Sequence, residues 1–600
     1  MIFLGFAVFL LFLSALPFAG AVCLKRRPER LFAAGLLLNG LVFYFACAVG
    51  LCGAGFYAIL AGNLALYVPA LLRVRKEPGA IRDFRTPGVK AFYLMLALGF
   101  LTAMREHLLW WDEFSHWGFS AKLLFETGRM TCEQGDLVEH ASYPPGLPVL
   151  DVLVHKCFFG AGFRDFIPRF AVRTAKICIF ILPFGDVPGR RASFRDCLAG
   201  MLFFWLLTCL MFPDGNFSCE SDCILGLVFV AAVYAVMRHD RSVADDLFLA
   251  LLLAWLFLIK KAGMGFAVMT QLLYVVRWIA DRRSGGTPKR PVWSLLVVLA
   301  APFAMQATWS LLLKIHHTPI IFPVGKISPA GIWRLVRYGE PDYWRDIAGL
   351  FGKQLLRRLP VFLAAVGGLV WYRLAAGNRP RRDGDLVWFL PLTAVMFLVT
   401  LFLTYMFIFS SFQAYLMVSF RRYVHGFMIM PLGVLLMLTF SGGWGDKARK
   451  ILTSYLVLVP VAVLIERLYV AEERSTGWFS RNWPKDSALI DARYGRLLRA
   501  PGKKFVIISG VNGGMYYYMF RYEFEDRFAA ELLLDDPESG RAKPATIREF
   551  VRQAPYVLVV YPQEDLAREY AELWETTPPE PGAPFTLFEV TPEGRLRPVR

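Results

Sequence analysis

The sequence contains ten cysteines but no CxxC pair, a spacing typical of metal and redox sites. Five cysteines lie inside apolar runs, where a thiol behaves as a small apolar side chain: Cys23, Cys47, Cys52, Cys178 and Cys209. Cys219 and Cys223 are four residues apart and can share one helix face, so a bridge or a structural metal there is the weaker alternative. As a set, the cysteines favour no disulfide framework.

Charged residues are also scarce, at 19%, whereas 56% of the residues are hydrophobic and 15% are aromatic. Apolar runs long enough to cross a bilayer recur along the chain, which predicts a polytopic membrane protein. In a soluble protein the net charge of +18 would suggest a nucleic-acid partner. Here Lys and Arg are concentrated in short loops between the apolar runs, where membrane topology accounts for them. No nucleic-acid partner is therefore predicted.

The first three predicted spans are 2–22, 31–50 and 51–72, and clusters of Lys and Arg follow the first and the third. Because the basic residues follow the first apolar run instead of preceding it, we do not expect a cleaved signal peptide. The positive-inside rule places both basic clusters in the cytoplasm and the N-terminus outside. A fourth span, 91–104, then leads the chain to the outer face.

Ten further spans are predicted at 170–184, 198–212, 222–237, 247–260, 263–278, 292–313, 361–372, 387–410, 426–440 and 451–469. With the first four they make about fourteen transmembrane helices, which places both termini outside. The run 146–160 is short for a crossing and predicts a re-entrant or interfacial helix. The predicted external loops span 105–165 and 314–360.

The composition changes from residue 471 onward, and we expect a small extracytoplasmic α/β domain at 471–600. It combines strands at 503–509 and 556–561, helices at 547–553 and 564–574, a turn at 512–514 and an aromatic segment at 516–522. The predicted fold class is thus mainly α, a polytopic membrane protein with a small C-terminal α/β domain.

The segment 110–117 places Asp112, Glu113 and His116 among three tryptophans directly after the fourth span. Tryptophan favours the membrane–water boundary, so this loop should lie at the bilayer surface. Ionisable groups held there are costly, which makes them a functional-site hypothesis. An aromatic belt followed by a helix cap explains the same residues equally well.

Two basic pairs break the positive-inside rule, because Lys260-Lys261 and Arg421-Arg422 fall on the predicted external side. They either extend toward lipid phosphates or neutralise a bound phosphate or pyrophosphate. Their position on the same side as Asp112 favours a bound phosphate. Aromatic and Arg residues in the external stretch 316–345 suit sugar stacking, and an interfacial helix carries them equally.

Several motifs resemble, in order, those of GT-C glycosyltransferases, particularly the branch with the lipid A aminoarabinose transferases and the protein O-mannosyltransferases. The motifs are Asp112-Glu113, Tyr143-Pro144-Pro145-Gly146, Glu220-Ser221-Asp222, Lys260-Lys261-Ala262-Gly263, and Arg422-Tyr423 followed by Pro431. Two features depart from the family pattern: three spans precede the first motif, and Gly146 replaces the leucine that follows the two prolines.

The resemblance implies extra helices at 1–90 before a GT-C-like catalytic core at 91–470. It also implies transfer of a sugar from a polyprenyl-phosphate donor to a glycan, lipid or protein acceptor on the outer face of the cytoplasmic membrane. Within this scheme Asp112 is the general base, and Glu113 orients it or binds a metal. Asp112, Glu113 and His116 are then candidate ligands of a divalent cation. The implied substrate-binding residues are His116, Tyr143, Asp222, Lys260, Lys261, Arg421, Arg422 and Tyr423.

A transporter or flippase of lipid-linked sugars is the alternative function. Transporters commonly consist of repeated halves, and the sequence shows no internal repeat. An external α/β domain also favours an enzyme that works on one face. A membrane scaffold without chemistry would leave Asp112, Glu113 and the two basic pairs unexplained.

Overall fold

The computed structural model describes residues 1–466 apart from 109–111, 134–137, 139, 161, 187–191, 213–220, 239–241, 285–290, 321–340, 377–384, 410 and 442–458. Beyond these it describes 490, 494, 497–498, 504–509, 515–524, 528–533, 535–536, 540–541, 544–560, 570–575, 578 and 585–599. The chain forms two compact units. Unit 1 comprises Met1–Glu106 and Ser120–Glu473, and unit 2 comprises His107–Phe119 and Arg474–Arg600.

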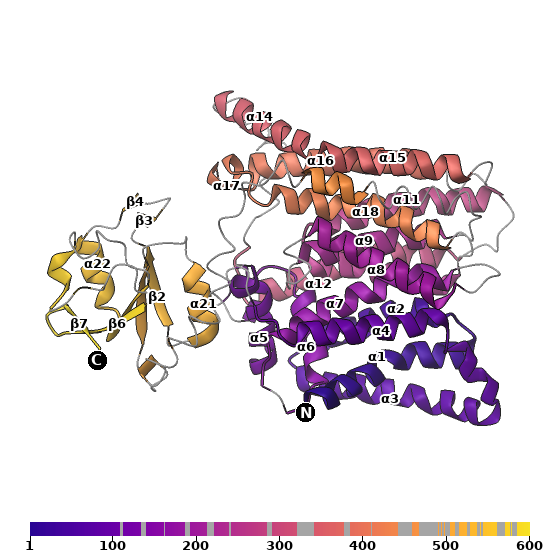
Figure 1. The fold of residues 1–600 in the computed structure, drawn as a ribbon, viewed down its shortest axis with the longest axis horizontal. Helices are drawn as coiled ribbons and strands as arrows, with labels where there is room; N and C mark the ends of the chain where they lie inside the picture. Colours follow the sequence, from indigo (N-terminus) through magenta and orange to yellow (C-terminus); the bar gives the residue numbers. More distant parts are fainter. Residues whose placement is uncertain are drawn as a thin grey trace. The chain divides into compact units, whose positions relative to one another are not determined.

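Unit 1 is built from helices, and its long helices run side by side (Figure 1). Those before residue 212 are α1 (Ile2–Leu24), α2 (Pro28–Ala48), α3 (Cys52–Lys76), η1 (Pro78–Asp83), α4 (Pro87–Ala103), η3 (Thr131–Glu133), α6 (Gly146–Lys156), α7 (Phe166–Phe180), η5 (Leu182–Gly185) and α8 (Phe194–Met211). The later ones are α9 (Ser221–Met237), α10 (Val243–Ile259), α11 (Gly263–Ser284), α12 (Val292–Ile315), α14 (Pro341–Arg357), α15 (Leu359–Ala376), α16 (Asp385–Phe407), α17 (Ser411–Tyr415) and α18 (Phe420–Ser441). Residues 459–466 are also helical.

Eight of the described helices are long and apolar enough to cross a membrane: α1, α2, α3, α8, α11, α12, α16 and α18. A helix satisfies all its backbone hydrogen bonds internally, which is the requirement for a chain in hydrocarbon. The prediction of a mainly helical multi-pass membrane protein is therefore confirmed, whereas the number fourteen stays a prediction. The run predicted as re-entrant forms α6, which has 11 residues.

The interior of unit 1 contains ion pairs that join helices distant in sequence. Asp186 bonds Arg30, lies 2.9 Å from Nε of Arg238, and accepts a hydrogen bond of 2.6 Å from the Tyr234 hydroxyl. Arg277 of α11 pairs with Asp385 of α16 at 3.0 Å. Since a buried charge without a partner is costly, these pairs restrict how the helices can pack.

Unit 2 contains a five-stranded mixed sheet in the order β2-β1-β5-β6-β7. The strands are β1 (Phe505–Ser509), β2 (Phe528–Leu533), β5 (Tyr556–Val560), β6 (Phe585–Val590) and β7 (Leu596–Pro598), with a separate pair of β3 (Asp535–Asp536) and β4 (Gly540–Arg541). β1 pairs in parallel with β2 and β5, whereas β6 is antiparallel to β5 and β7. The helices are α21 (Met515–Phe524), α22 (Pro544–Val551) and η9 (Ala571–Leu573). The α/β character predicted for the C-terminal region is thus present.

The core of unit 2 shows which local predictions were right. The predicted strands coincide with β1 and β5, whose residues are all buried, and the predicted helix at 547–553 overlaps α22. The aromatic segment forms the helix α21. Of the helix predicted at 564–574, residues 564–569 lie outside the described residues, and Ala571–Leu573 is a 3-10 turn. The turn at 512–514 also lies outside them.

The predicted topology can be tested by cysteine labelling at three exposed positions, Val49, Glu77 and Glu593. In a background with serine at the native cysteines, we expect an impermeant thiol reagent to label Val49→Cys and Glu593→Cys in intact cells. Glu77→Cys, beside the basic end of α3, should react only after lysis. Labelling of Glu593→Cys only after lysis would contradict an external C-terminal domain.

Candidate functional site

Asp222 connects three helices of unit 1 through ion pairs. It lies in the first turn of α9, and its side chain is 5% exposed. One carboxylate oxygen lies 2.7 Å from Nζ of Lys260, which follows α10 directly. The other oxygen lies 3.5 Å from Nε of Arg422 in the first turn of α18. The carboxylate therefore brings together cations that are far apart in sequence.

The turn between α10 and α11 places Lys260 beside Asp222. Lys260 has an extended backbone, with φ −160° and ψ 144°, so α10 ends at Ile259. The chain then enters α11 at Gly263, where an added Cβ would lie 1.8 Å from the carbonyl oxygen of Leu256. Only glycine fits this close approach. The glycine of the Lys260-Lys261-Ala262-Gly263 motif is therefore required by packing.

The neighbouring Lys261 contacts the segment that precedes α6. Its Nζ lies 3.2 Å from the hydroxyl oxygen of Ser142, which is fully buried. The Ser142 carbonyl accepts a hydrogen bond of 3.1 Å from the indole of Trp309 in α12. An added Cβ on Gly146 would lie 2.5 Å from the carbonyl oxygen of Leu258. Glycine at this position, where the resembled family has leucine, thus lets α6 start against the last turn of α10.

The two adjacent lysines differ in their surroundings. Lys260 lies 2.7 Å from the Asp222 carboxylate, which stabilises the charged form of its ammonium. Its ammonium also lies 5.1 Å from the ring centroid of Tyr423, a cation–π contact. Burial lowers the pKa of Lys261 to about 8. At neutral pH Lys260 is fully charged, and Lys261 loses its charge in the mildly alkaline range.

The two arginines of the Arg421-Arg422 pair have different neighbours. Arg422 pairs with Asp222, and Arg421 lies near Glu466. Glu466 is buried, and one of its oxygens lies 2.9 Å from Nε2 of His425 and 3.1 Å from Nη1 of Arg358. His425 and Glu466 are not among the predicted site residues, although ionisable groups in or beside predicted spans are a recognised signal of a functional site.

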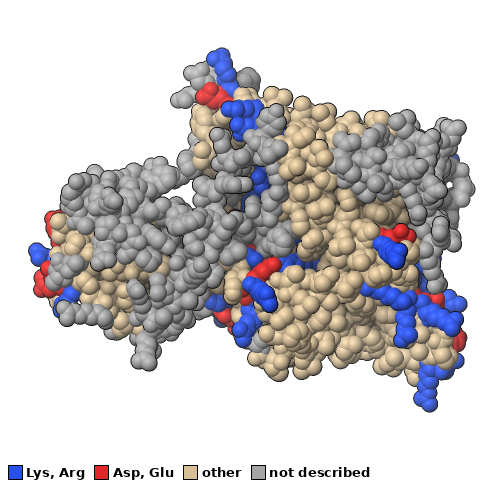
Figure 2. Space-filling view, viewed as in Figure 1, with Lys and Arg blue, Asp and Glu red and all other residues tan. Residues whose placement is uncertain are grey.

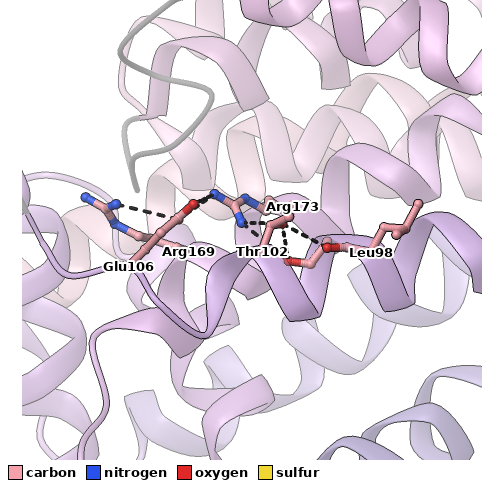
Figure 3. Close-up of polar contacts among 6 residues, drawn as sticks. Leu98, Thr102, Glu106, Arg169 and Arg173 are labelled. Atoms are coloured by element: carbon pink, nitrogen blue, oxygen red, sulfur yellow. Dashed lines mark hydrogen bonds and ion pairs between the residues drawn. The ribbon is translucent and has the colours of Figure 1, made fainter.

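A third group of buried charges holds the end of the segment that follows α4 (Figure 3). Arg173 of α7 binds both carboxylate oxygens of Glu106 and donates a hydrogen bond of 3.1 Å to the Thr102 hydroxyl. Arg169, one turn earlier on α7, lies 3.6 Å from the same carboxylate. The pairs anchor the chain at Glu106, the last residue of unit 1 before the segment that carries Asp112.

Asp112, Glu113 and His116 belong to unit 2. Asp112 is half-buried and precedes a short π-helix, η2 (Glu113–Trp117), in which Glu113 is fully buried. Nδ1 of His116 lies 2.7 Å from the Ser115 hydroxyl oxygen. Short π-helical turns often occur at functional sites. Trp110 and Trp111 of the predicted motif lie outside the described residues.

Two features hold η2 within unit 2. The ring of Phe114 packs against Tyr522 of α21, with centroids 5.4 Å apart. At Gly118, where α5 (Gly118–Thr127) begins, an added Cβ would lie 2.8 Å from the Glu113 carbonyl oxygen. The wide turn therefore depends on glycine at position 118.

The structure thus gathers Asp222, Lys260, Arg422 and Tyr423 at one place in unit 1. Tyr143 lies near Lys260, and Lys261 is the next residue in the turn. Among the residues that the structure describes, no group of three or more His, Cys, Asp or Glu side chains is arranged to hold a metal ion. Asp112, Glu113 and His116, the candidate ligands of a divalent cation, are among these described residues.

No protein-family model matches the chain, and no curated protein matches it at a significant level. The similarity to GT-C glycosyltransferases therefore stays a prediction drawn from motifs in the sequence.

The Asp222–Lys260 ion pair predicts a specific stability effect. Asp222→Asn should lower the free energy of unfolding in detergent by about 3–5 kcal/mol, because it leaves buried cations without their carboxylate. Lys260→Met alone should also destabilise, and the double variant should lose less than the sum of the two single variants. Denaturant titration of the four proteins measures this coupling. Strictly additive losses would show that the ion pair does not stabilise the fold.

Proposed function

We propose that the protein is a GT-C-type glycosyltransferase that transfers a sugar from a polyprenyl-phosphate donor to an acceptor on the outer face of the cytoplasmic membrane. In this proposal the core has about fourteen spans, and the active site and C-terminal domain are external. The observation that carries it is the cluster of Lys260 and Arg422 around Asp222, with Lys261 beside it. The identities of the sugar and the acceptor stay open.

The cluster suits the leaving group of such a reaction. When the bond between the anomeric carbon and the phosphate oxygen breaks, negative charge develops on the polyprenyl phosphate, and preorganised cations stabilise it. Lys260 and Arg422 are held in place by Asp222, so little reorganisation is needed. Lys261 contacts the neutral hydroxyl of Ser142, a partner that does not neutralise its charge. Tyr143 and Tyr423 beside Lys260 supply the aromatic contacts expected around a sugar ring.

The assignment of Asp112 as general base rests on the resemblance. In the proposed reaction its carboxylate accepts the proton of the acceptor hydroxyl while that oxygen attacks the anomeric carbon. The products are the glycosylated acceptor and free polyprenyl phosphate, so the charges balance without a redox step. The burial of Glu113 supports a role in holding the loop, and His116 is positioned by its contact with Ser115.

The lowered pKa of Lys261 predicts a pH-dependent affinity for the donor. A phosphate binds the protonated ammonium, so affinity should be highest below pH 8 and fall by about tenfold as Lys261 loses its proton. Lys260 keeps its charge over this range. Lys261→Arg should remove the pH dependence, because the guanidinium stays protonated. Equilibrium binding of a radiolabelled polyprenyl-phosphate sugar between pH 6.5 and 9 measures it, and an identical fall in the arginine variant would assign the effect to another group.

Asp112→Asn tests the catalytic step. The amide keeps the shape of the side chain but cannot accept a proton, so turnover should fall by roughly a hundredfold to ten-thousandfold while donor binding survives. Glu113→Gln should cost less if Glu113 only holds the loop. Glu589→Gln, on an exposed strand position of the same unit, is the matched control and should be fully active. Wild-type turnover in Asp112→Asn would show that Asp112 is not the general base.

The same preparation separates a transferase from a flippase. A transferase forms glycosylated acceptor in detergent, where no membrane separates two compartments. A flippase would move the donor across proteoliposome membranes without forming product. The assay needs a panel of polyprenyl-phosphate sugars and acceptors, because the chemical identity of both is open.

A further inference from the structure

A groove with a volume of about 520 Å³ lies among the N-terminal helices of unit 1. It is lined by Ala7, Leu10, Leu11, Ser14 and Phe18 of α1, Tyr67 of α3, Phe84 after η1, and Tyr93 of α4. The outer surfaces of these helices are rich in exposed apolar residues such as Leu4, Leu64 and Val68. Since α1 and α3 are candidate membrane spans, the groove opens toward lipid.

The walls of this groove present hydrocarbon, although three of its residues carry hydroxyl groups. The Tyr67 hydroxyl donates to the carbonyl oxygen of Leu11 at 2.7 Å. The Ser14 hydroxyl donates to the carbonyl oxygen of Leu10 at 2.5 Å and bonds the Tyr93 hydroxyl at 2.5 Å. With these groups bonded inside the protein, an occupant finds few polar partners along the wall. The part of a ligand that fits here is therefore an apolar chain.

The length of the groove matches one leaflet of a bilayer. Its lining on α1 extends from Ala7 to Phe18, which is about 16 Å along a helix. Half of the hydrocarbon core of a membrane is about 15 Å thick. An acyl chain aligned with the helices would thus be accommodated over its length.

One end of the groove adjoins a strongly basic surface. The Phe84 ring lies 5.3 Å from that of Phe18 and 6.5 Å from that of Tyr93, and it closes this end of the groove. Arg85 follows Phe84 directly, and Arg82 precedes it by two residues, so both lie within a few ångströms of the groove end. Apolar contacts between Phe18, Ala70 and Ile81 hold the ends of α1, α3 and η1 together there.

The exposed basic residues at these helix ends are Lys25, Arg26, Arg27, Arg75, Lys76, Arg82, Arg85 and Lys90. Figure 2 shows the Lys and Arg side chains gathered at the lower right, over the end of the N-terminal helices opposite residue 1. Three acidic residues lie on these segments: Glu77 is paired with Arg73 at 3.1 Å, Asp83 belongs to η1, and Glu29 is buried and accepts a hydrogen bond from Thr86. Such a surface attracts an anion.

We infer that this groove binds one anionic phospholipid, with an acyl chain along α1 and the phosphate on the basic end beside Arg82 and Arg85. A hydrocarbon wall and a cluster of cations at its end match the two parts of such a lipid. The inference does not depend on the proposed glycosyl transfer, because none of these residues belongs to the candidate site. It assigns a role to the helices at 1–90, which precede the predicted catalytic core.

Native mass spectrometry of the delipidated full-length protein tests the inference, with dioleoylphosphatidylglycerol and dioleoylphosphatidylcholine titrated separately. The first phosphatidylglycerol should bind at least about tenfold more tightly than phosphatidylcholine. Replacing both Arg82 and Arg85 by Gln should reduce this preference to near equality of the two lipids, since each cation near a lipid surface contributes about fivefold. Arg282→Gln with Arg283→Gln, an exposed pair at the end of α11, is the charge-matched control and should keep the preference.

The acyl chain is tested by filling the groove. Ala7→Trp should abolish the tight binding event for both lipids, whereas Ala65→Trp should leave it unchanged. Ala65 is exposed on α3 and lies on the side of that helix away from Tyr67, about 200° around its axis. A thermal transition equal to that of the wild type, measured without lipid, shows that each variant is folded. Equal affinity for the two lipids, or equal effects of the two tryptophans, would overturn the inference.

Discussion

Largely buried carboxylates, none more than 19% exposed, each bind two basic groups and restrict how the helices of unit 1 pack. Four centres share this arrangement: Asp222 with Lys260 and Arg422, Glu106 with Arg169 and Arg173, Asp186 with Arg30 and Arg238, and Glu466 with Arg358 and His425. A charge in an apolar interior is costly unless it is paired, so each centre restricts the positions of the helices that meet at it. The packing of apolar surfaces alone would allow more arrangements.

This arrangement also explains how a chain with a net charge of +18 keeps basic groups inside a helical unit. Each of these carboxylates carries one negative charge and binds two basic side chains. It can therefore balance the positive charge of only one of them. At Asp222 the result is two cations around one carboxylate, with a titratable lysine beside them. Such a geometry suits an anionic leaving group, because the cations are oriented before the substrate arrives.

The sequence indicated Lys260, Arg422 and Asp222 as site residues, but it did not indicate their contacts with one another. Lys260 and Arg422 were predicted as site residues because they violate the positive-inside rule. In the structure both contact Asp222. Arg421, which has the same charge and violates the same rule, lies near Glu466. The two arginines are adjacent on α18 and point about 100° apart around its axis, so their neighbours differ. No sequence pattern indicated Arg358 or Ser142 as site residues, because their contacts are with residues far away in the chain.

The sequence by itself determined that the chain forms membrane-spanning helices and a C-terminal α/β region. Apolar runs in lipid must satisfy their backbone hydrogen bonds internally, and short β-branched runs such as β1 and β5 favour strands, so local composition is sufficient. Only the tertiary structure decided which charges pair and where glycine is obligatory. Gly146 and Gly263 are required by carbonyl oxygens on α10, and those contacts arise only when the helices pack. Pairing and close approach depend on the rotation of each helix against its neighbours, which no local stretch of sequence contains.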